Sequence, residues 1–320
     1  MQEFENKGDK PTKTGFGEGV RDAARINPHV VGLGADITTS VGMNLFAIEF
    51  PERFFSLGIA EQNCIGVAAG MALSGKIPVF STYGVFAAMR TTDFIRISLC
   101  YNNLHVIIGG AHAGISVGPD GATHQALEDI AMMRVLPNMT VISPCDATQA
   151  RIATIQAIQE LTGPVYIRFG REAVPDFTNV NQKFEIGKSE LMYDGNDATI
   201  IATGHLVWEA LQAAKALKEK GIRVRVLNMH TIKPIDKGAI IKAARETGRI
   251  ITAEEHQVTG GLGGAVAEVI AGNFPVPVHY VGMPDCFGES GSPRELMEKY
   301  GLTSQSIQKI ILESPDIRSL

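Results

Sequence analysis

Residues 54–70, FFSLGIAEQNCIGVAAG, predict a short strand that turns into a closely packed helix. Arg53–Leu57 is apolar enough for a strand, Gly58 favours the turn, and the small residues of GVAAG favour close packing of the helix on its neighbours. The one acid of this stretch, Glu61, then falls in the first turn of the helix. An acid in that place commonly caps the helix or pairs with a basic residue, so any further role depends on the rest of the chain.

The composition of the 320 residues is that of a globular protein, with 45% hydrophobic and 20% charged residues, and the length allows about two domains. No apolar run is long enough to cross a bilayer, and the N-terminal residues MQEFENKGDKPTK are polar and unlike a signal peptide. A net charge of -5 without a Lys/Arg cluster argues against nucleic acid and anionic membranes as partners. We therefore expect a cytoplasmic protein.

The cysteines lie far apart in apolar or turn contexts, without CxxC or Cys/His metal spacing, at Cys64, Cys100, Cys145 and Cys286. We expect reduced thiols and no metal ligands on this chain.

Short apolar runs alternate with helical stretches along the chain, which is the pattern of parallel sheets covered by helices on both faces. The runs that predict strands are 29–36, 77–80, 104–110, 139–143 and 164–169, and then 198–204, 223–230 and 249–255. A polar, breaker-rich segment separates the two sets. We therefore expect two doubly wound α/β domains at 13–178 and 193–320, a linker at 179–192 and a flexible tail at 1–12.

The loops that follow the predicted strands carry most of the candidate functional residues. Ligands of open parallel sheets bind beyond the carboxyl ends of the strands, so these loops should meet at one edge. The candidates there are Asp36, Ser40, Tyr83, Phe86, His112, Asp120, His124 and Arg171. Taken singly, each of these residues is most simply interpreted as a core, turn or surface residue without a functional role. Together they predict a site for a flat heterocycle and a hydroxylated, phosphorylated substrate.

Several stretches, in order, resemble the second half of transketolase, an enzyme that uses thiamine diphosphate. They are SLGIAEQNCIGVAAGMA (56–72), STYGVF (81–86), DGATHQALEDIAMMRVLPNMTVISPCDA (120–147), GPVYIRFGRE (163–172), VLNMHTIKPID (226–236) and ITAEEHQVTGGLGGAVAE (251–268). The resemblance covers nearly all of the chain after Lys13 and implies a pyrimidine-binding domain followed by a transketolase C-terminal-like domain. It also implies transfer of a two-carbon ketol unit from a ketose to an aldose.

The resemblance implies that Glu61 is a catalytic, cofactor-binding residue that hydrogen-bonds a pyrimidine nitrogen of the cofactor. A carboxyl group buried among small apolar residues has its charged form disfavoured, which suits it to donate a proton there. Tyr83 and Phe86 would flank the pyrimidine ring, and Asp36 is assigned to the cofactor with them. Met89 stands where transketolases commonly have a third aromatic residue, so cofactor affinity is expected to be lower.

For the substrate, the resemblance implies that His124 is a catalytic residue beside the reacting hydroxyl groups and that Asp120 binds a substrate hydroxyl. The residues assigned to the anionic end are Ser40, His112, Arg171 and Lys13. Lys13 stands where the family usually has Arg, which makes planar paired contacts that Lys cannot. The terminal anion is therefore expected to be a sulfonate or a displaced phosphate rather than an ordinary sugar phosphate.

The diphosphate and Mg²⁺ site of the family, a GDG motif followed by an Asn, has no match here, since GPDG (118–121) and DGND (194–197) are different sequences. The resemblance therefore implies a split transketolase, whose N-terminal subunit carries that motif, in an α2β2 heterotetramer. Residues 193–320 would serve mainly assembly.

Three alternatives stay open at this stage. Deoxyxylulose phosphate synthase shares GIAEQ and a similar DG-THQ stretch, but it is normally one long chain. The beta subunits of oxoacid dehydrogenases share the two-domain layout but lack DGATHQALED. A non-catalytic scaffold of the same fold is the third alternative, and the joint presence of Glu61, Asp120 and His124 argues against it.

Overall fold

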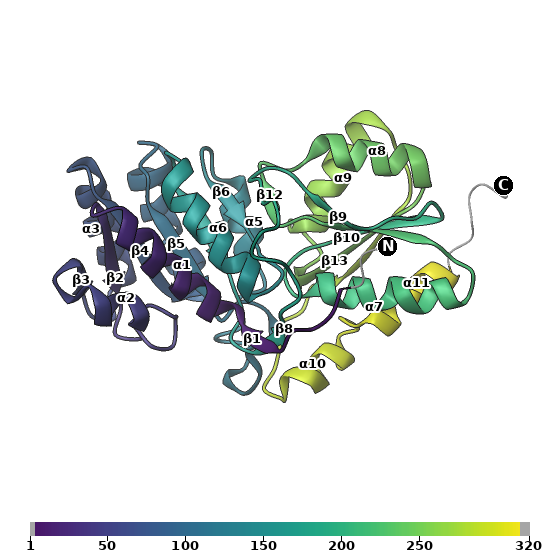
Figure 1. The fold of residues 1–320 in the computed structure, drawn as a ribbon, viewed down its shortest axis with the longest axis horizontal. Helices are drawn as coiled ribbons and strands as arrows, with labels where there is room; N and C mark the ends of the chain where they lie inside the picture. The colour runs from purple at the N-terminus through teal and green to yellow at the C-terminus, as the bar shows by residue number, and fades with distance from the viewer. Residues whose placement is uncertain (1–3, 314–320) are drawn as a thin grey trace.

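The computed structural model describes residues 4–313, which form two α/β domains joined along the chain (Figure 1). The N-terminal domain lies on the purple-to-teal side of the view and the C-terminal domain on the green-to-yellow side. No helix among the described residues is long and apolar enough to cross a membrane.

The N-terminal domain is built on a seven-stranded sheet in the order β12-β6-β7-β5-β4-β2-β3. Its strands are β2 (Val30–Gly34), β3 (Phe54–Ser56), β4 (Ile77–Tyr83), β5 (Ile107–Ala111), β6 (Thr140–Ile142), β7 (Val165–Arg168) and β12 (Thr231–Lys233). All neighbours are parallel except β12, which pairs antiparallel with β6.

Helices cover both faces of this sheet, as the sequence predicts. Its α-helices are α1 (Thr12–Ile26), α2 (Asn44–Glu49), α3 (Glu61–Leu73), α4 (Thr92–Phe94), α5 (Asp129–Val135) and α6 (Ala147–Glu160). Short 3₁₀ segments are η1 (Pro51–Arg53) and η4 (Ile115–Asp120), and π-helical segments are η2 (Phe86–Arg90) and η3 (Ile95–Cys100). Helices α1 and α6 share one apolar cluster, while α3, α5, η2 and η3 share another.

The C-terminal domain is built on a five-stranded sheet in the order β14-β13-β10-β11-β9. The strands are β9 (Glu190–Tyr193), β10 (Ala198–Ala202), β11 (Val224–Asn228), β13 (Ile250–Gln257) and β14 (Val278–Met283), of which only β9 is antiparallel to its neighbour. Its helices are α7 (Leu206–Glu219), α8 (Lys237–Thr247), α9 (Leu262–Asn273), α10 (Pro293–Lys299) and α11 (Ser304–Glu313). The prediction of two doubly wound domains is confirmed.

Two segments expected to lack regular structure contain strands. Asp9–Pro11 forms β1 and pairs antiparallel with β8 (Ala173–Pro175), although it falls within the expected N-terminal tail. Strand β9 begins at Glu190, within the expected linker. These pairings are between residues far apart in sequence, so local patterns do not reveal them.

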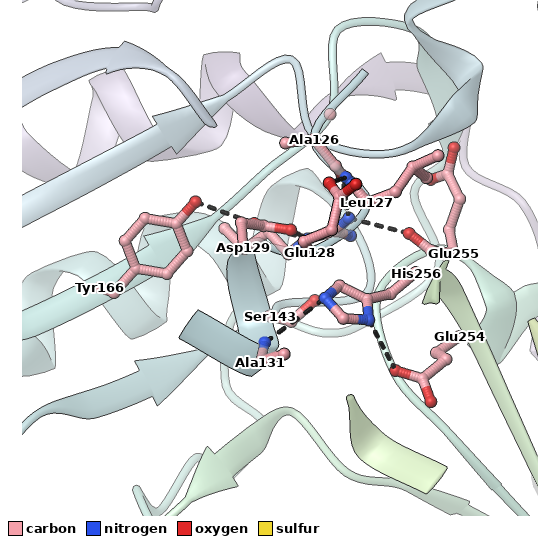
Figure 2. Close-up of polar contacts among 12 residues, drawn as sticks. Ala126, Leu127, Glu128, Asp129, Ala131, Ser143, Tyr166, Glu254, Glu255 and His256 are labelled. Atoms are coloured by element: carbon pink, nitrogen blue, oxygen red, sulfur yellow. Dashed lines mark hydrogen bonds and ion pairs between the residues drawn. The ribbon is translucent and has the colours of Figure 1, made fainter. Parts of the chain in front are cut away.

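The two domains share a buried polar joint (Figure 2). Asp129 accepts hydrogen bonds from the Tyr166 hydroxyl at 2.8 Å and from Arg168 Nε at 3.0 Å. Arg168 also donates through Nη2 to the main-chain oxygens of Ala126, at 3.1 Å, and Glu255, at 2.8 Å. Because Glu255 belongs to β13, the Arg168 guanidinium ties the C-terminal sheet to the N-terminal domain.

Candidate active site

The strand order brings the predicted site residues to one edge of the N-terminal sheet. Strands β7, β5, β4, β2 and β3 are neighbours in that order and run parallel, so their carboxyl ends meet at the same edge. The residues at or just beyond these ends are, in the same order, Arg171, His112, Tyr83, Asp36 and Glu61. Arg171 and His112, assigned to the substrate anion, therefore lie toward β7, and Asp36 and Glu61, assigned to the cofactor, lie toward β3.

Glu61 is the first residue of α3 and its side chain is only 3% exposed, as the sequence predicts. Its charge, however, is paired. Arg90 Nη1 donates to Glu61 Oε2 at 2.9 Å, and the Arg90 guanidinium carbon lies 4.3 Å from the centre of the Phe86 ring. The pairing with a basic residue, which the sequence left open for an acid at this position, is therefore present together with the expected burial.

Four rings gather beside Glu61 and Arg90. Tyr83 stacks on His112 with ring centres 4.3 Å apart, and lies 6.0 Å from Phe86. His124 stands edge-on to both Tyr83 and Phe86, with ring centres 5.7 Å and 5.5 Å away. The structure thus brings together the two aromatic residues assigned to the cofactor and two histidines. Of these, His124 was assigned to the reacting hydroxyl groups and His112 to the substrate anion.

His112 is a neutral hydrogen-bonding group in this arrangement. Its Nε2 donates to the main-chain oxygen of Ser40 at 3.1 Å, and burial, followed by the charges of Lys13 and Arg171, lowers its pKa to about 4. Its Nδ1 is buried without a partner among the described residues. His112 therefore offers an acceptor to a ligand at neutral pH, and Ser40 meets it through the main chain.

Lys13 and Arg171 are neighbouring cations at the other end of the site, and Glu172 Oε1 lies 3.6 Å from Arg171 Nε. Burial, and then the nearby charge of Arg171, lower the pKa of Lys13 below its ordinary value. Arg171 Nη1 also contacts Asp120 Oδ1 at 3.2 Å and the Val117 carbonyl at 3.3 Å. Two partly buried cations that repel each other gain from an anion placed between them.

Asp36 lies at the edge between β2 and β3. It has a positive φ of 64°, and its Oδ1 accepts a hydrogen bond from the Ser56 hydroxyl at 2.9 Å. Cys64, one turn into α3, is fully buried, and its pKa is raised to about 11 by burial and then by the charges of Glu61 and Asp36. The Cys64 thiol therefore remains protonated at neutral pH.

The C-terminal domain supports the loop that carries Asp120, a role that sequence reasoning missed. Glu255 Oε1 accepts from the Ser116 main-chain N–H at 2.6 Å, and its Oε2 lies 3.1 Å from His205 Nδ1. Gln125 Nε2 donates to the Ile115 and Glu289 carbonyls, at 3.1 Å and 2.9 Å. No local signal marks the contacts between the domains, because their partners are more than a hundred residues apart.

Arg90 was also missed, although its spacing offered a signal. It follows Phe86 by four residues, which is the separation at which side chains of a helix contact each other. Among the described residues, no three His, Cys, Asp or Glu side chains are grouped so that they could hold a metal ion.

Comparisons with known proteins match both domains. The family described as "Transketolase, pyrimidine binding domain" matches residues 9–176, and "Transketolase, C-terminal domain" matches residues 187–307. The chain is 46% identical to a putative transketolase C-terminal section of Methanocaldococcus jannaschii, over 95% of this chain and 96% of that protein.

Two further relatives are named as parts of transketolases. The 6-deoxy-6-sulfo-D-fructose transketolase subunit of a Clostridium species is 43% identical over 89% of this chain and 88% of its own length. An apulose-4-phosphate transketolase subunit of Phocaeicola vulgatus is 42% identical over 93% of this chain and 95% of its own length. A 1-deoxy-D-xylulose-5-phosphate synthase of Trichormus variabilis is 37% identical, but this chain covers only 46% of it.

A solved structure described as a split gene transketolase, in an inactive beta4 tetramer, superimposes with a TM-score of 0.87 at 46% identity. The match covers 96% of this chain and 98% of the other. Both the family matches and the full-length relatives agree with the resemblance found in the sequence. The chain belongs to the transketolase family, as the section made of the pyrimidine-binding and C-terminal domains.

Proposed function

We propose that this chain is the second subunit of a thiamine diphosphate-dependent transketolase in the cytoplasm, which transfers a two-carbon ketol unit from an anionic ketose to an aldose. The observation that carries the proposal is the convergence of Glu61, the rings of Tyr83 and Phe86, and His124 at one sheet edge. Full-length relatives named as transketolase subunits support it.

These residues fit the pyrimidine part of thiamine diphosphate. A buried carboxylate at a helix start can hydrogen-bond a ring nitrogen, and two tilted aromatic rings offer apolar surface to a flat heterocycle. When bound, the cofactor supplies the carbanion chemistry that breaking and forming the carbon–carbon bond requires. Glu61 would hold and exchange the proton at the ring nitrogen, and Asp36 would add negative charge nearby.

His124 and Asp120 are the residues we assign to substrate hydroxyl groups. The Nδ1 atom of His124 lies 2.9 Å from the Thr123 hydroxyl, which orients the imidazole and leaves its other nitrogen for proton transfer. The unpartnered Nδ1 of His112 can accept a hydrogen bond from the same substrate. We therefore propose that His112 recognises a hydroxyl or other donor, rather than supplying positive charge.

Lys13 and Arg171 are the residues we assign to the substrate anion, with the Ser40 loop beside them. The mutual repulsion of these two cations is relieved by a bound anion. One relative is named for a sulfonated ketose and another for a phosphorylated ketose. Relatives of this chain are thus named for substrates with either a sulfonate or a phosphate group. We propose that Lys13, as a flexible point charge, suits a sulfonate or a displaced phosphate.

The partner that we propose is an N-terminal transketolase subunit with the GDG motif, which would supply the Mg²⁺ and diphosphate ligands in an α2β2 heterotetramer. The support is that relatives of nearly the same extent are named as sections or subunits of transketolases. Deoxyxylulose phosphate synthases are a weaker alternative, because this chain spans about half of their length at lower identity. The full-length relatives favour neither the oxoacid dehydrogenase nor the scaffold alternative.

The proposal is tested by purifying the tagged chain with its host partner and measuring two-carbon transfer with thiamine diphosphate, Mg²⁺ and a panel of ketose donors. We expect cofactor-dependent transfer by the complex. We expect Glu61→Ala to lower kcat by about a thousandfold or more, since proton exchange at the cofactor is lost. The control is Glu18→Ala, which removes a carboxylate paired with Lys10 outside the site. Transfer at near-normal rate by the Glu61→Ala complex would contradict the assigned role.

A further inference from the structure

The side chain of Arg90 occupies the two contacts that a bound pyrimidine ring is expected to use. Its Nη1 donates to Glu61 Oε2 at 2.9 Å, and its guanidinium lies over the Phe86 ring at 4.3 Å. We propose that Arg90 is a placeholder that fills the pyrimidine position in the cofactor-free chain and is displaced when thiamine diphosphate binds. This inference rests on the proposed function only for the identity of the cofactor.

Burial explains why the cofactor-free chain needs a placeholder. The Glu61 side chain is 3% exposed, and a buried carboxylate without a partner is strongly unfavourable. A guanidinium is planar and stacks on aromatic rings, so it can replace a flat heterocycle in both its hydrogen bond and its ring contact. Arg90 therefore keeps Glu61 paired until a ligand arrives.

Exposure explains how the placeholder can leave. The Arg90 side chain is 43% exposed, in contrast to the carboxylate that it contacts. A side chain with that much solvent contact can turn outward and be hydrated, whereas Glu61 is fixed at the start of α3. Replacement of Arg90 by the cofactor thus needs only a movement of the Arg90 side chain, while α3 stays in place.

The local helix geometry places Arg90 in this position. Phe86–Arg90 is π-helical, and such turns are rare, short and frequent at functional sites. The turn begins with the ring and ends with the guanidinium that covers it. Phe86 and the Arg90 guanidinium that lies over its ring therefore belong to the same π-helical turn.

The inference predicts two effects of opposite sign for Arg90→Met. The cofactor-free chain should become less stable, because the buried Glu61 carboxylate loses its partner. Binding of thiamine diphosphate should become tighter, on the order of tenfold, because the competing occupant is gone and the binding-competent state is more populated. A residue that only holds the helix together would weaken binding when it is removed.

The experiment measures thiamine diphosphate binding to the assembled complex by isothermal titration calorimetry with Mg²⁺ present, and thermal unfolding of the cofactor-free chain. Arg96→Met is the matched control, since it removes an exposed arginine that follows Arg90 closely in the sequence and is not the partner of Glu61. Arg90→Gln is measured as well, in case Arg90→Met does not assemble. Gln can still donate to Glu61 but cannot form an ion pair, so we expect the same signs with smaller changes.

Tighter binding with a lower unfolding temperature, seen for Arg90 variants but not for Arg96→Met, supports the inference. Binding that is unchanged or weaker in the Arg90 variants overturns it while leaving the proposed function intact. Failure of both the wild-type complex and the variants to bind thiamine diphosphate overturns the proposed function together with the inference.

Discussion

Glu61 shows that the chemistry of a single residue depends on its neighbours in space as well as on its place in the sequence. Its position at the start of a helix among small residues is a local property, and the structure confirms it. Its chemistry depends on Arg90, which reaches it from 29 residues away and pairs with it. A buried acid thus has to be described together with the cation that compensates its charge.

Lys13 provides a test of the anion site at this scale. We expect Lys13→Met to raise KM for the anionic ketose by about 10- to 100-fold with little change in kcat, because a charge-assisted hydrogen bond to the anion is lost in both ground and transition states. Steady-state kinetics of the assembled complex measure the effect. Lys10→Met is the control, since Lys10 pairs with Glu18. An unchanged KM for the Lys13 variant would remove Lys13 from the substrate site.

At the scale of elements, the packing of α1 on α6 illustrates why certain positions have to be glycine. A Cβ atom on Gly15 would lie 1.9 Å from the main-chain oxygen of Ala147, at the start of α6. The two helices can approach closely only because the side chain is absent. Since α1 begins one residue before Lys13, this approach also helps to position Lys13, which we propose binds the substrate anion.

We expect Gly15→Ala to lower the free energy of unfolding by about 1–3 kcal/mol, because the backbone of α6 must shift to relieve the contact. Urea unfolding of the chain measures the change. Gly272→Ala, on α9, is the matched control, because its Cβ meets nothing within 4 Å. There the loss of glycine should stabilise the helix by about 0.5–1 kcal/mol. Equal effects of the two substitutions would show that the close approach of α1 and α6 is unimportant.

At the scale of the whole molecule, a segment that follows the linker adds a strand to the sheet of the N-terminal domain. Strand β12 extends the seven-stranded sheet beyond β6, and His230, directly before it, stacks on Phe184 with ring centres 4.1 Å apart. Phe184 lies between the two family matches, in the 179–192 segment that we propose as the linker. This linker is therefore packed against the fold at that residue.

His230 also predicts a pH dependence of stability. Burial lowers its pKa to about 4, so the folded chain keeps it neutral while the unfolded chain takes up a proton below about 6.5. Its contribution is present above that pH and is lost as pH falls toward 4, by up to roughly 3 kcal/mol. We expect His230→Gln to show a smaller loss of unfolding free energy than the wild type between pH 6.5 and 4. Parallel pH profiles of the two proteins would disprove this contribution, because all other titrating groups are common to both.

The sequence by itself determined the two α/β domains, the central strands of both sheets and most of the candidate site residues. These features follow from apolar periodicity, turn residues and ordered motifs. Such patterns lie within short stretches of the chain, so they can be recognised before the fold is known. The predicted strand and helix around Glu61, for example, are found at Phe54–Ser56 and Glu61–Leu73.

The tertiary structure alone decided which charges and hydrogen-bonding groups meet. The Glu61–Arg90 pair, the nearness of Lys13 to Arg171, the neutral state of His112 and the support of Ser116 by Glu255 all join separate elements. Such contacts depend on the order of strands in the sheet and on burial, which lowers the screening of charge by water. A pattern along the chain records residue types and spacing, but the energy of an ion pair depends on distance and surroundings in space.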